Sequence, residues 1–277
     1  MKQYLSSRHE LERIYESPIY CGVSIKGKYV NFDFNEDSST DIIKLKNQSY
    51  GEYDDDGVTY IYGYSYTSNA RKTDTDFFRD FIKGRITPRV WDIRDVEDFI
   101  RYGVLAIEQY MNFSDFGAIV NLVPRETFST VGMIRRELME YIETGTIQFH
   151  MIKQAYRNVT FDADLAADAM RRTGHFTEAD IRREVSYTIE KFNKLKAENE
   201  LFEIKRFIPK ELRAGFLNYF KFKSEEERAV FEKLQGVNVL IYDDFLTSGS
   251  TIKEVIRYLR AINNNNTLTV FVLVKQH

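Results

Sequence analysis

VLIYDDFLTSGST, Val239 to Thr251, is the stretch of this chain that decides its fold. Its four leading apolar residues predict a buried strand, and a loop of hydroxyl residues with one glycine then leads into a helix. The start of a helix offers free backbone N–H groups and a positive dipole end, which bind anions such as phosphate. Carboxylates repel phosphate, so Asp243 and Asp244 are better suited to accept hydrogen bonds from sugar hydroxyls or to hold a cation.

The residues after this loop predict a strand–helix–strand unit. Apolar residues recur at helical spacing from Ile252 to Ile262, and Ser248 or Ser250 suits the N-cap of this helix. The β-branched and apolar run Thr267 to Val274 predicts the next buried strand. Ligands of parallel sheets bind at the carboxyl ends of the strands, which is where Asp243 and Asp244 are expected.

This pattern resembles the motif with which type I phosphoribosyltransferases bind phosphoribosyl diphosphate (PRPP). In the family an apolar strand, two acids and two apolar residues precede Thr-Thr/Ser-Gly-x-Thr, and here the pattern is VLIY-DD-FL-TSGST. Tyr242 and Phe245 depart from the usual aliphatic residues, at positions without a chemical role in the family. The match is close over about a dozen residues and looser over the second half of the chain.

The resemblance implies a function and a set of site residues. Family members transfer phosphoribose from PRPP to a base nitrogen or an amine, with Mg²⁺, and release pyrophosphate. Asp243 and Asp244 would contact the ribose hydroxyls, serve catalysis by stabilising positive charge at the sugar, and hold Mg²⁺ indirectly or through the substrate. The residues that would hold the 5-phosphate are Thr247, Ser248, Gly249, Ser250 and Thr251.

Two further segments correspond to phosphate contacts in that family. The first core strand is expected over Gly117 to Val123, and the loop that begins with Pro124 and Arg125 lies where the family binds pyrophosphate. Arg125 can pair with phosphate oxygens bidentately, although a plain surface loop explains the segment equally well. Lys153 follows the next strand, where some members place a phosphate-contacting lysine and where many proteins have a solvated one.

Composition limits the class of protein. The 277 residues carry a net charge of −3, which argues against a general nucleic-acid binder. The single cysteine, Cys21, excludes an internal disulfide, and four scattered histidines give no zinc-binding spacing. No apolar stretch is long enough to span a membrane, so a cytoplasmic location is the default expectation.

The predicted fold class is α/β, with a mainly parallel, Rossmann-like sheet flanked by helices as in phosphoribosyltransferases. Residues 1–72 predict a β-rich N-terminal subdomain, in which Lys26-Gly27-Lys28 turns a hairpin. The sequence around this turn nearly spells a P-loop, but Tyr29 occupies the Ser/Thr position and no helix follows. In the run Tyr60 to Tyr66, alternate tyrosines share one strand face, which either stacks bases or, more commonly, packs against a small sheet.

Residues 73–277 predict the α/β core, with a helical insertion over about 154–235. Core helices are expected over 74–83 and 92–110, and a third is expected to end at Gly145. Within the insertion, helices are expected over 164–172 and 177–199. The family closes a mobile loop over PRPP in this part of the chain. Arg213 and Asn218 are faintly similar to residues of the competence-associated ComF-like subgroup.

Three functions remain open from the sequence alone. The leading one is a phosphoribosyltransferase that acts on PRPP and a nucleobase or amine acceptor. A non-catalytic protein that senses PRPP or a nucleotide would retain the same motif. An interaction domain that has lost the ligand would instead need the two acids to be structural. Family members are often homodimers, although no stretch of this sequence indicates a self-complementary surface.

Overall fold

The structure, a computed structural model, describes most of the chain from Tyr20 onward. It covers residues 20–27, 29–34, 43–46, 51–53, 57–66, 72–83, 86, 89–90, 93–109, 111–122, 130–142, 145–197, 200–246 and 249–276. The chain forms two compact units. The first comprises Met1–Gln148, Gly236–Thr247 and Asn266–His277, and the second comprises Phe149–Gln235 and Ser248–Asn265.

Four parallel strands form the centre of the first unit. In spatial order they are β7 (Ala118–Leu122), β12 (Asn238–Leu246), β13 (Thr267–Gln276) and β5 (Thr59–Tyr66). Val239, Leu240 and Ile241 of β12 are all fully buried, so both faces of this strand are covered. Strands buried on both faces need near-continuous apolar runs, which explains the composition of β12 and β13. The α/β class and the mainly parallel central sheet are thereby confirmed.

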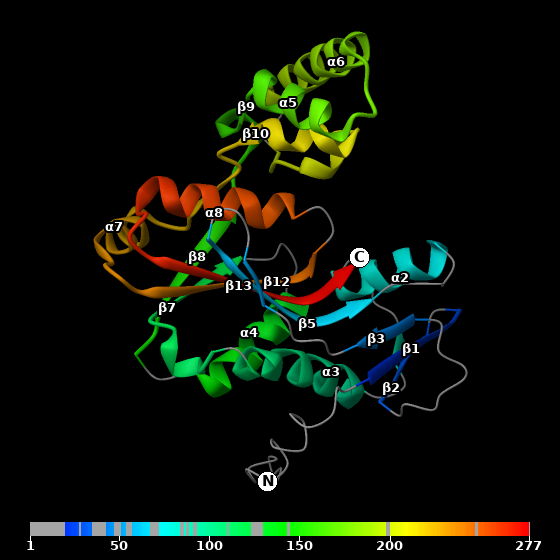
Figure 1. Ribbon diagram of the computed structural model, residues 1–277, viewed down its shortest axis with the longest axis vertical. Helices are drawn as coiled ribbons and strands as arrows, with labels where there is room; N and C mark the ends of the chain where they lie inside the picture. Colours follow the sequence, from blue (N-terminus) through cyan, green and yellow to red (C-terminus); the bar gives the residue numbers. More distant parts are fainter. Residues whose placement is uncertain are drawn as a thin grey trace. The chain divides into compact units, whose positions relative to one another are not determined.

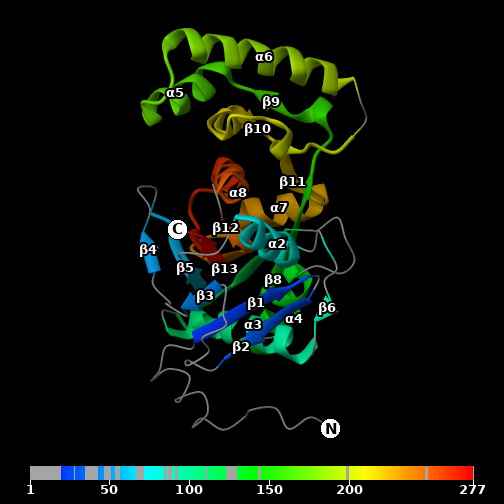
Figure 2. The same cartoon turned by 90° about the vertical axis from the view of Figure 1, so that its right-hand side faces the viewer.

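Antiparallel strands extend this sheet beyond β5, and Figure 2 shows β1, β2 and β3 together. β3 (Ile43–Lys46) pairs with β5 and with β1 (Tyr20–Lys26), and β1 pairs with β2 (Tyr29–Asp33). β6 (Arg89–Val90) joins β2, and β4 (Gly51–Tyr53) pairs with β5. Lys26 lies opposite Tyr29 across a turn at Gly27, whose φ is 62°. The hairpin prediction is confirmed, and the near-P-loop sequence folds as this hairpin.

Three tyrosines of β5, Tyr60, Tyr62 and Tyr64, lie in the core. The rings of Tyr60 and Tyr62 stack with their centroids 6.4 Å apart. Tyr64 stacks on Phe99 at 4.5 Å, and its hydroxyl group donates a hydrogen bond to the Phe99 carbonyl at 2.9 Å. All three tyrosines are buried, so they provide no exposed surface on which a base could stack. β5 falls within the range 1–72 but pairs along its length with β13, a strand of the core sheet.

The described residues of the first unit also include three helices. α2 spans Lys72–Ile82, α3 spans Ile93–Leu105 and α4 spans Thr130–Tyr141, as the apolar spacing predicted. α3 and α4 pack on each other along the same face of this sheet (Figure 1). The predicted helix over 92–110 continues past α3 only as the 3₁₀ turn η1 (Ala106–Gln109), and a second 3₁₀ turn, η2 (Phe113–Asp115), precedes β7. α4 ends four residues before Gly145, so that glycine does not cap it.

Two glycines allow α3 to approach β5 closely. A Cβ atom at Gly63 would lie 2.9 Å from the Gly103 carbonyl oxygen and 3.0 Å from that of Leu273. A Cβ atom at Gly103 would collide with the Leu273 side chain and lie 2.9 Å from the Tyr64 ring. This contact therefore requires residues without side chains on both elements.

We expect Gly63→Ala to lower the free energy of unfolding by about 2–3 kcal/mol, because the methyl group meets backbone atoms that cannot rotate away. Urea denaturation measures the change. Gly145→Ala is the control, because nothing lies within 4 Å of its Cβ position. That variant should stay within about 0.5 kcal/mol of the wild type. Equal stability of the two variants would contradict the close approach.

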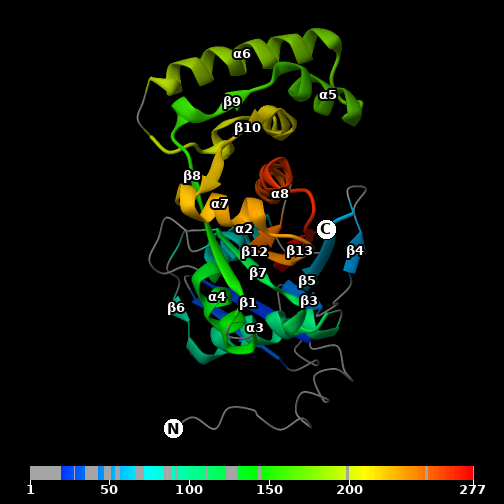
Figure 3. The ribbon, with the colours of Figure 1, turned by 90° about the vertical axis from the view of Figure 1, so that its left-hand side faces the viewer.

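The second unit contains the insertion, whose two long helices lie side by side in Figure 3. α5 (Ala163–Thr173) and α6 (Glu178–Lys196) confirm the helices predicted there. Asp162 caps α5, and Thr177 forms a capping box with Asp180 at the start of α6. Buried aromatic rings, including Phe192, fill the centre of the insertion. They also include Tyr156, Phe202, Phe207 and Phe216.

The second unit also contains α8 (Ser250–Ile262) and several shorter elements. β8 (Ile147–Lys153) begins in the first unit and pairs antiparallel with β11 (Phe220–Phe222) in the second. Short elements complete it: η3 (Tyr156–Asn158), β9 (Thr160–Phe161), η4 (Ile204–Arg206), η5 (Lys210–Gly215), β10 (Phe216–Leu217) and α7 (Glu225–Lys233). None of the helices in the described ranges is both long enough and apolar enough to cross a membrane.

Candidate functional site

The two acids lie inside β12 rather than after it. The strand was expected to end at Tyr242, but it continues to Leu246, which lies in register with Lys275 of β13. Adjacent side chains of a strand point to opposite faces, so Asp243 and Asp244 diverge. Asp243 is half-buried, whereas Asp244 is only 7% exposed. The Asp243 carboxylate accepts a hydrogen bond from the Asp244 N–H at 2.9 Å.

The connections of the sheet reverse direction beside these acids. β12 pairs in parallel with β7, and Ile241 lies opposite Val120. From β7 the chain leads through α4 to β8, which begins on the far side of β7 with a hydrogen bond from Ile147 to Gly117. From β12 it leads through α8 to β13 on the other side. In open α/β sheets, the carboxyl ends of strands at such a reversal form the usual ligand crevice.

A buried hydrogen bond links the two strands at this reversal. The Tyr242 hydroxyl donates to Asn121 Oδ1 at 2.6 Å, and both residues are almost completely buried. Burial raises the pKa of Tyr242, so its hydroxyl stays protonated as a donor. The pair fixes β12 relative to β7 one residue before Asp243. Each residue is polar within an apolar run, and this is the signal that the sequence offers for the pair.

α8 begins at a glycine in the left-handed conformation. Gly249 is the N-cap residue, with φ 68° and ψ 3°, and as a glycine it makes no side-chain capping bond. The expected cap at Ser250 is wrong, because Ser250 is already the first helical residue, and Ser248 lies outside the described residues. Few residues other than glycine tolerate this φ, which explains the glycine of the motif. Ser250 and Thr251 follow it directly and place their backbone N–H groups in the first turn of α8.

Two lysines lie near the carboxyl ends of the parallel strands in the first unit. Lys83, which follows α2, has its ammonium group 3.3 Å from the Phe245 carbonyl oxygen and 5.7 Å from the centre of the Phe245 ring. The Lys275 ammonium lies 4.3 Å from the centre of the Tyr62 ring. Both charges add positive potential at this edge of the sheet. No local pattern in the sequence could have predicted either position.

The remaining predicted residues lie in the second unit or outside the described residues. Lys153 is the last residue of β8 and is exposed, opposite Phe220 of β11. Arg213 donates a hydrogen bond to the Phe207 carbonyl oxygen at 3.1 Å, and burial lowers its pKa. Asn218 contacts α8, because its backbone N–H donates a hydrogen bond to Glu254. Four predicted residues lie outside the described residues: Pro124, Arg125, Thr247 and Ser248.

The chemistry of the acids suits Mg²⁺ that arrives with a substrate. Within the described ranges, no group of three or more His, Cys, Asp or Glu side chains could hold a metal ion. Proteins usually bind Mg²⁺ through one or two carboxylates together with substrate phosphates. The half-buried Asp243 carboxylate supplies such hard oxygen donors and fits a metal that is bound jointly with a phosphorylated substrate, whereas Asp244 lies on the opposite, buried face of β12.

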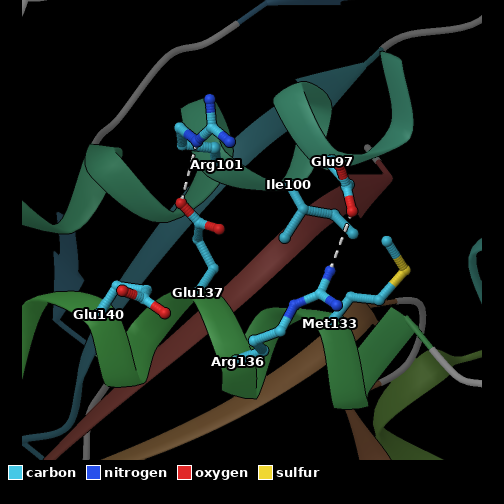
Figure 4. Close-up of a pocket in the computed structure, with 7 residues that line it drawn as sticks. All are labelled: Glu97, Ile100, Arg101, Met133, Arg136, Glu137 and Glu140. Atoms are coloured by element: carbon cyan, nitrogen blue, oxygen red, sulfur yellow. Dashed lines mark hydrogen bonds and ion pairs between the residues drawn. The ribbon is translucent and has the colours of Figure 1, made fainter. Parts of the chain in front are cut away.

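A charged pocket of about 220 Å³ lies between α3 and α4 (Figure 4). Ion pairs bridge these helices, from Arg101 to Glu137 at 3.2 Å and from Arg136 to Glu97 at 3.3 Å. The pairs tie one helix to the other, and none of the predicted site residues lines the pocket. We therefore assign these charges a structural role. The remaining lining residues are Ile100, Met133 and Glu140.

Comparison of the chain with protein-family models gives no match, and comparison with curated proteins gives no significant one. The function is therefore inferred from the chemistry of the residues between Asp243 and Thr251.

Proposed function

We propose that the protein binds PRPP through residues 243–251 and transfers its phosphoribosyl group to a nucleobase or an amine. The start of α8 is the observation that carries this proposal. Gly249 adopts a conformation suited to glycine, and as the N-cap residue it has no side chain with which to cap the first turn, so the amides of that turn suit an anion. The acids precede this glycine by a few residues, as they do in the PRPP motif.

The chemistry of the site residues agrees with each part of PRPP. Backbone N–H groups at a helix start bind the 5-phosphate, and carboxylates accept hydrogen bonds from ribose hydroxyls. Each charge-assisted hydrogen bond contributes roughly 1.5–3 kcal/mol. A handful of them is sufficient for micromolar binding, which corresponds to about −8 kcal/mol.

The transfer breaks the bond from the ribose C1 to pyrophosphate and forms a bond from C1 to the acceptor nitrogen, which loses its proton. Positive charge develops on the sugar in between, and carboxylates fixed in β12 stabilise that charge by preorganised electrostatics. Lys83 and Lys275 add positive potential for an anionic substrate and leaving group. Mg²⁺, when bound with PRPP, would neutralise charge on the leaving pyrophosphate.

Pyrophosphate release in the presence of PRPP, Mg²⁺ and a panel of purine bases, pyrimidine bases and amines tests this proposal. We expect release with at least one acceptor and loss of release in Asp243→Asn. PRPP binding without release for any acceptor would support the non-catalytic sensor instead. The absence of PRPP binding at millimolar concentration would contradict both functions.

A further inference from the structure

Tyr219 holds the first turn of α8 from outside the helix. It immediately precedes β11 in the second unit, and its hydroxyl group donates a hydrogen bond to the Ser250 carbonyl oxygen at 2.7 Å. Tyr219 is 2% exposed, and its ring packs against Phe202 and Phe220 with centroids 5.1 Å away in each case. Burial raises the pKa of Tyr219, so the hydroxyl remains a donor at all ordinary pH values.

This hydrogen bond fixes the direction of one of the amides in the first turn of the helix. A trans peptide is planar, and its C=O and N–H groups point in opposite directions. The Ser250 carbonyl shares its peptide plane with the Thr251 N–H, which has no partner within an α-helix because it lies in the first turn. By holding the Ser250 oxygen, Tyr219 sets the orientation of the Thr251 N–H, one of the amides proposed to bind phosphate.

A second contact holds the next turn of α8. The backbone N–H of Asn218 donates to Glu254 Oε1 at 2.6 Å, and Asn218 adopts a left-handed φ of 63°. Arg257 donates to both carboxylate oxygens of Glu254, at 2.7 and 2.9 Å, and to Asn218 Oδ1 at 3.1 Å. Glu254 is 4% exposed, so its negative charge near the helix start would oppose a phosphate if Arg257 did not neutralise it.

We propose that Tyr219 and Asn218 are positioning residues, through which the insertion before β12 orients the first amides of α8 for the 5-phosphate. This inference rests on the proposed function and extends it, because it assigns the insertion a role in phosphate affinity. Neither residue needs to touch the ligand. Their effect passes through the Ser250 carbonyl and the Glu254 carboxylate.

Calorimetric titration with ribose 5-phosphate tests the inference on the full chain, with Tyr219→Phe compared to Tyr258→Phe. Tyr258 is the matched control because it lies on α8, its hydroxyl group is hydrogen-bonded to the backbone of Phe222, and its ring contacts Phe222 at 5.8 Å. Each variant deletes one hydroxyl group that bonds to backbone. Only Tyr219 acts on the first turn.

We expect Tyr219→Phe to weaken ribose 5-phosphate binding about five- to tenfold, as for the loss of one net hydrogen bond, and Tyr258→Phe to change it less than about twofold. In a ¹⁵N-labelled protein without ligand, the Thr251 amide resonance should shift in Tyr219→Phe and stay in place in Tyr258→Phe. If Tyr219→Phe does not fold, Asn218→Gly serves instead, because it permits the left-handed backbone and the bond to Glu254 but removes the contact to Arg257.

Equal weakening by both tyrosine variants, or full affinity in Tyr219→Phe, would overturn the positioning role. The same holds for Asn218→Gly if it takes the place of Tyr219→Phe and binds with full affinity. A wild-type protein that binds no ribose 5-phosphate would instead contradict the proposed function, so the two failures are distinguishable.

Discussion

PRPP with Mg²⁺ should raise the melting temperature of the wild-type protein by about 5–10 °C at a hundred times its Kd, and the double variant Asp243→Asn/Asp244→Asn should lose most of that rise. A ligand that binds only the folded state contributes about 2.7 kcal/mol at this concentration, and a chain of this size gains roughly 2–4 °C per kcal/mol. Two charge-assisted hydrogen bonds to ribose contribute at least about 3 kcal/mol together. Their loss should therefore weaken binding by at least about a hundredfold.

The two single variants refine this result. Asp243 is half-buried and Asp244 lies on the opposite, buried face of β12, so we expect Asp243→Asn to account for the larger part of the loss. Asp33→Asn is the control, because Asp33 is another acid at the end of a strand in the first unit. A thermal shift that is unchanged in the double variant, or equally reduced in Asp33→Asn, would show that the acids of β12 do not hold the ligand.

Gly249→Val should abolish detectable PRPP binding, which is the second large effect. A β-branched residue at φ 68° costs at least about 1–2 kcal/mol in backbone strain, and its side chain would crowd the amides that the phosphate approaches. We expect affinity to fall at least about a hundredfold in a calorimetric titration, since contacts of several amides are lost together.

Gly174→Val separates strain from binding. Gly174 closes α5 with φ 68° and ψ 7°, nearly the same conformation as Gly249, and nothing lies within 4 Å of its Cβ position. Both variants should therefore lose similar thermal stability, while only Gly249→Val loses affinity for PRPP. Full affinity in Gly249→Val would place the phosphate elsewhere.

Local patterns predicted the elements around the site well. The helical spacing from Ile252 to Ile262 and the apolar run from Thr267 predicted α8 and β13, because each pattern reports directly on burial. The helices of the insertion were predicted for the same reason. The predicted end of β12 was wrong, because aspartates are poor strand residues and a strand was therefore not expected to continue through them. The two aspartates are nevertheless part of β12, because the neighbouring strand β13 continues to Gln276 and pairs with it.

Contacts between residues that are distant in the sequence could not be predicted from local patterns. The alternating tyrosines of β5 predicted a shared strand face that either stacks bases or packs in a small sheet, and only the pairing with β13, about two hundred residues later, shows that β5 is a strand of the core sheet. Tyr219 carries no local signal for its hydrogen bond to Ser250, because neither residue type specifies a partner. Asn121 and Tyr242 offer a partial signal, since polar residues inside apolar strands need partners when they are buried, but the residue types do not specify which partner.

A crystal structure of the protein with PRPP and Mg²⁺ tests the central claim most directly. We predict a 5-phosphate oxygen within about 3 Å of the backbone nitrogen of Thr251, and ribose hydroxyls hydrogen-bonded to the Asp243 carboxylate. Clear density for PRPP at another place, or none at saturating concentration while the start of α8 stays uncovered, would contradict it.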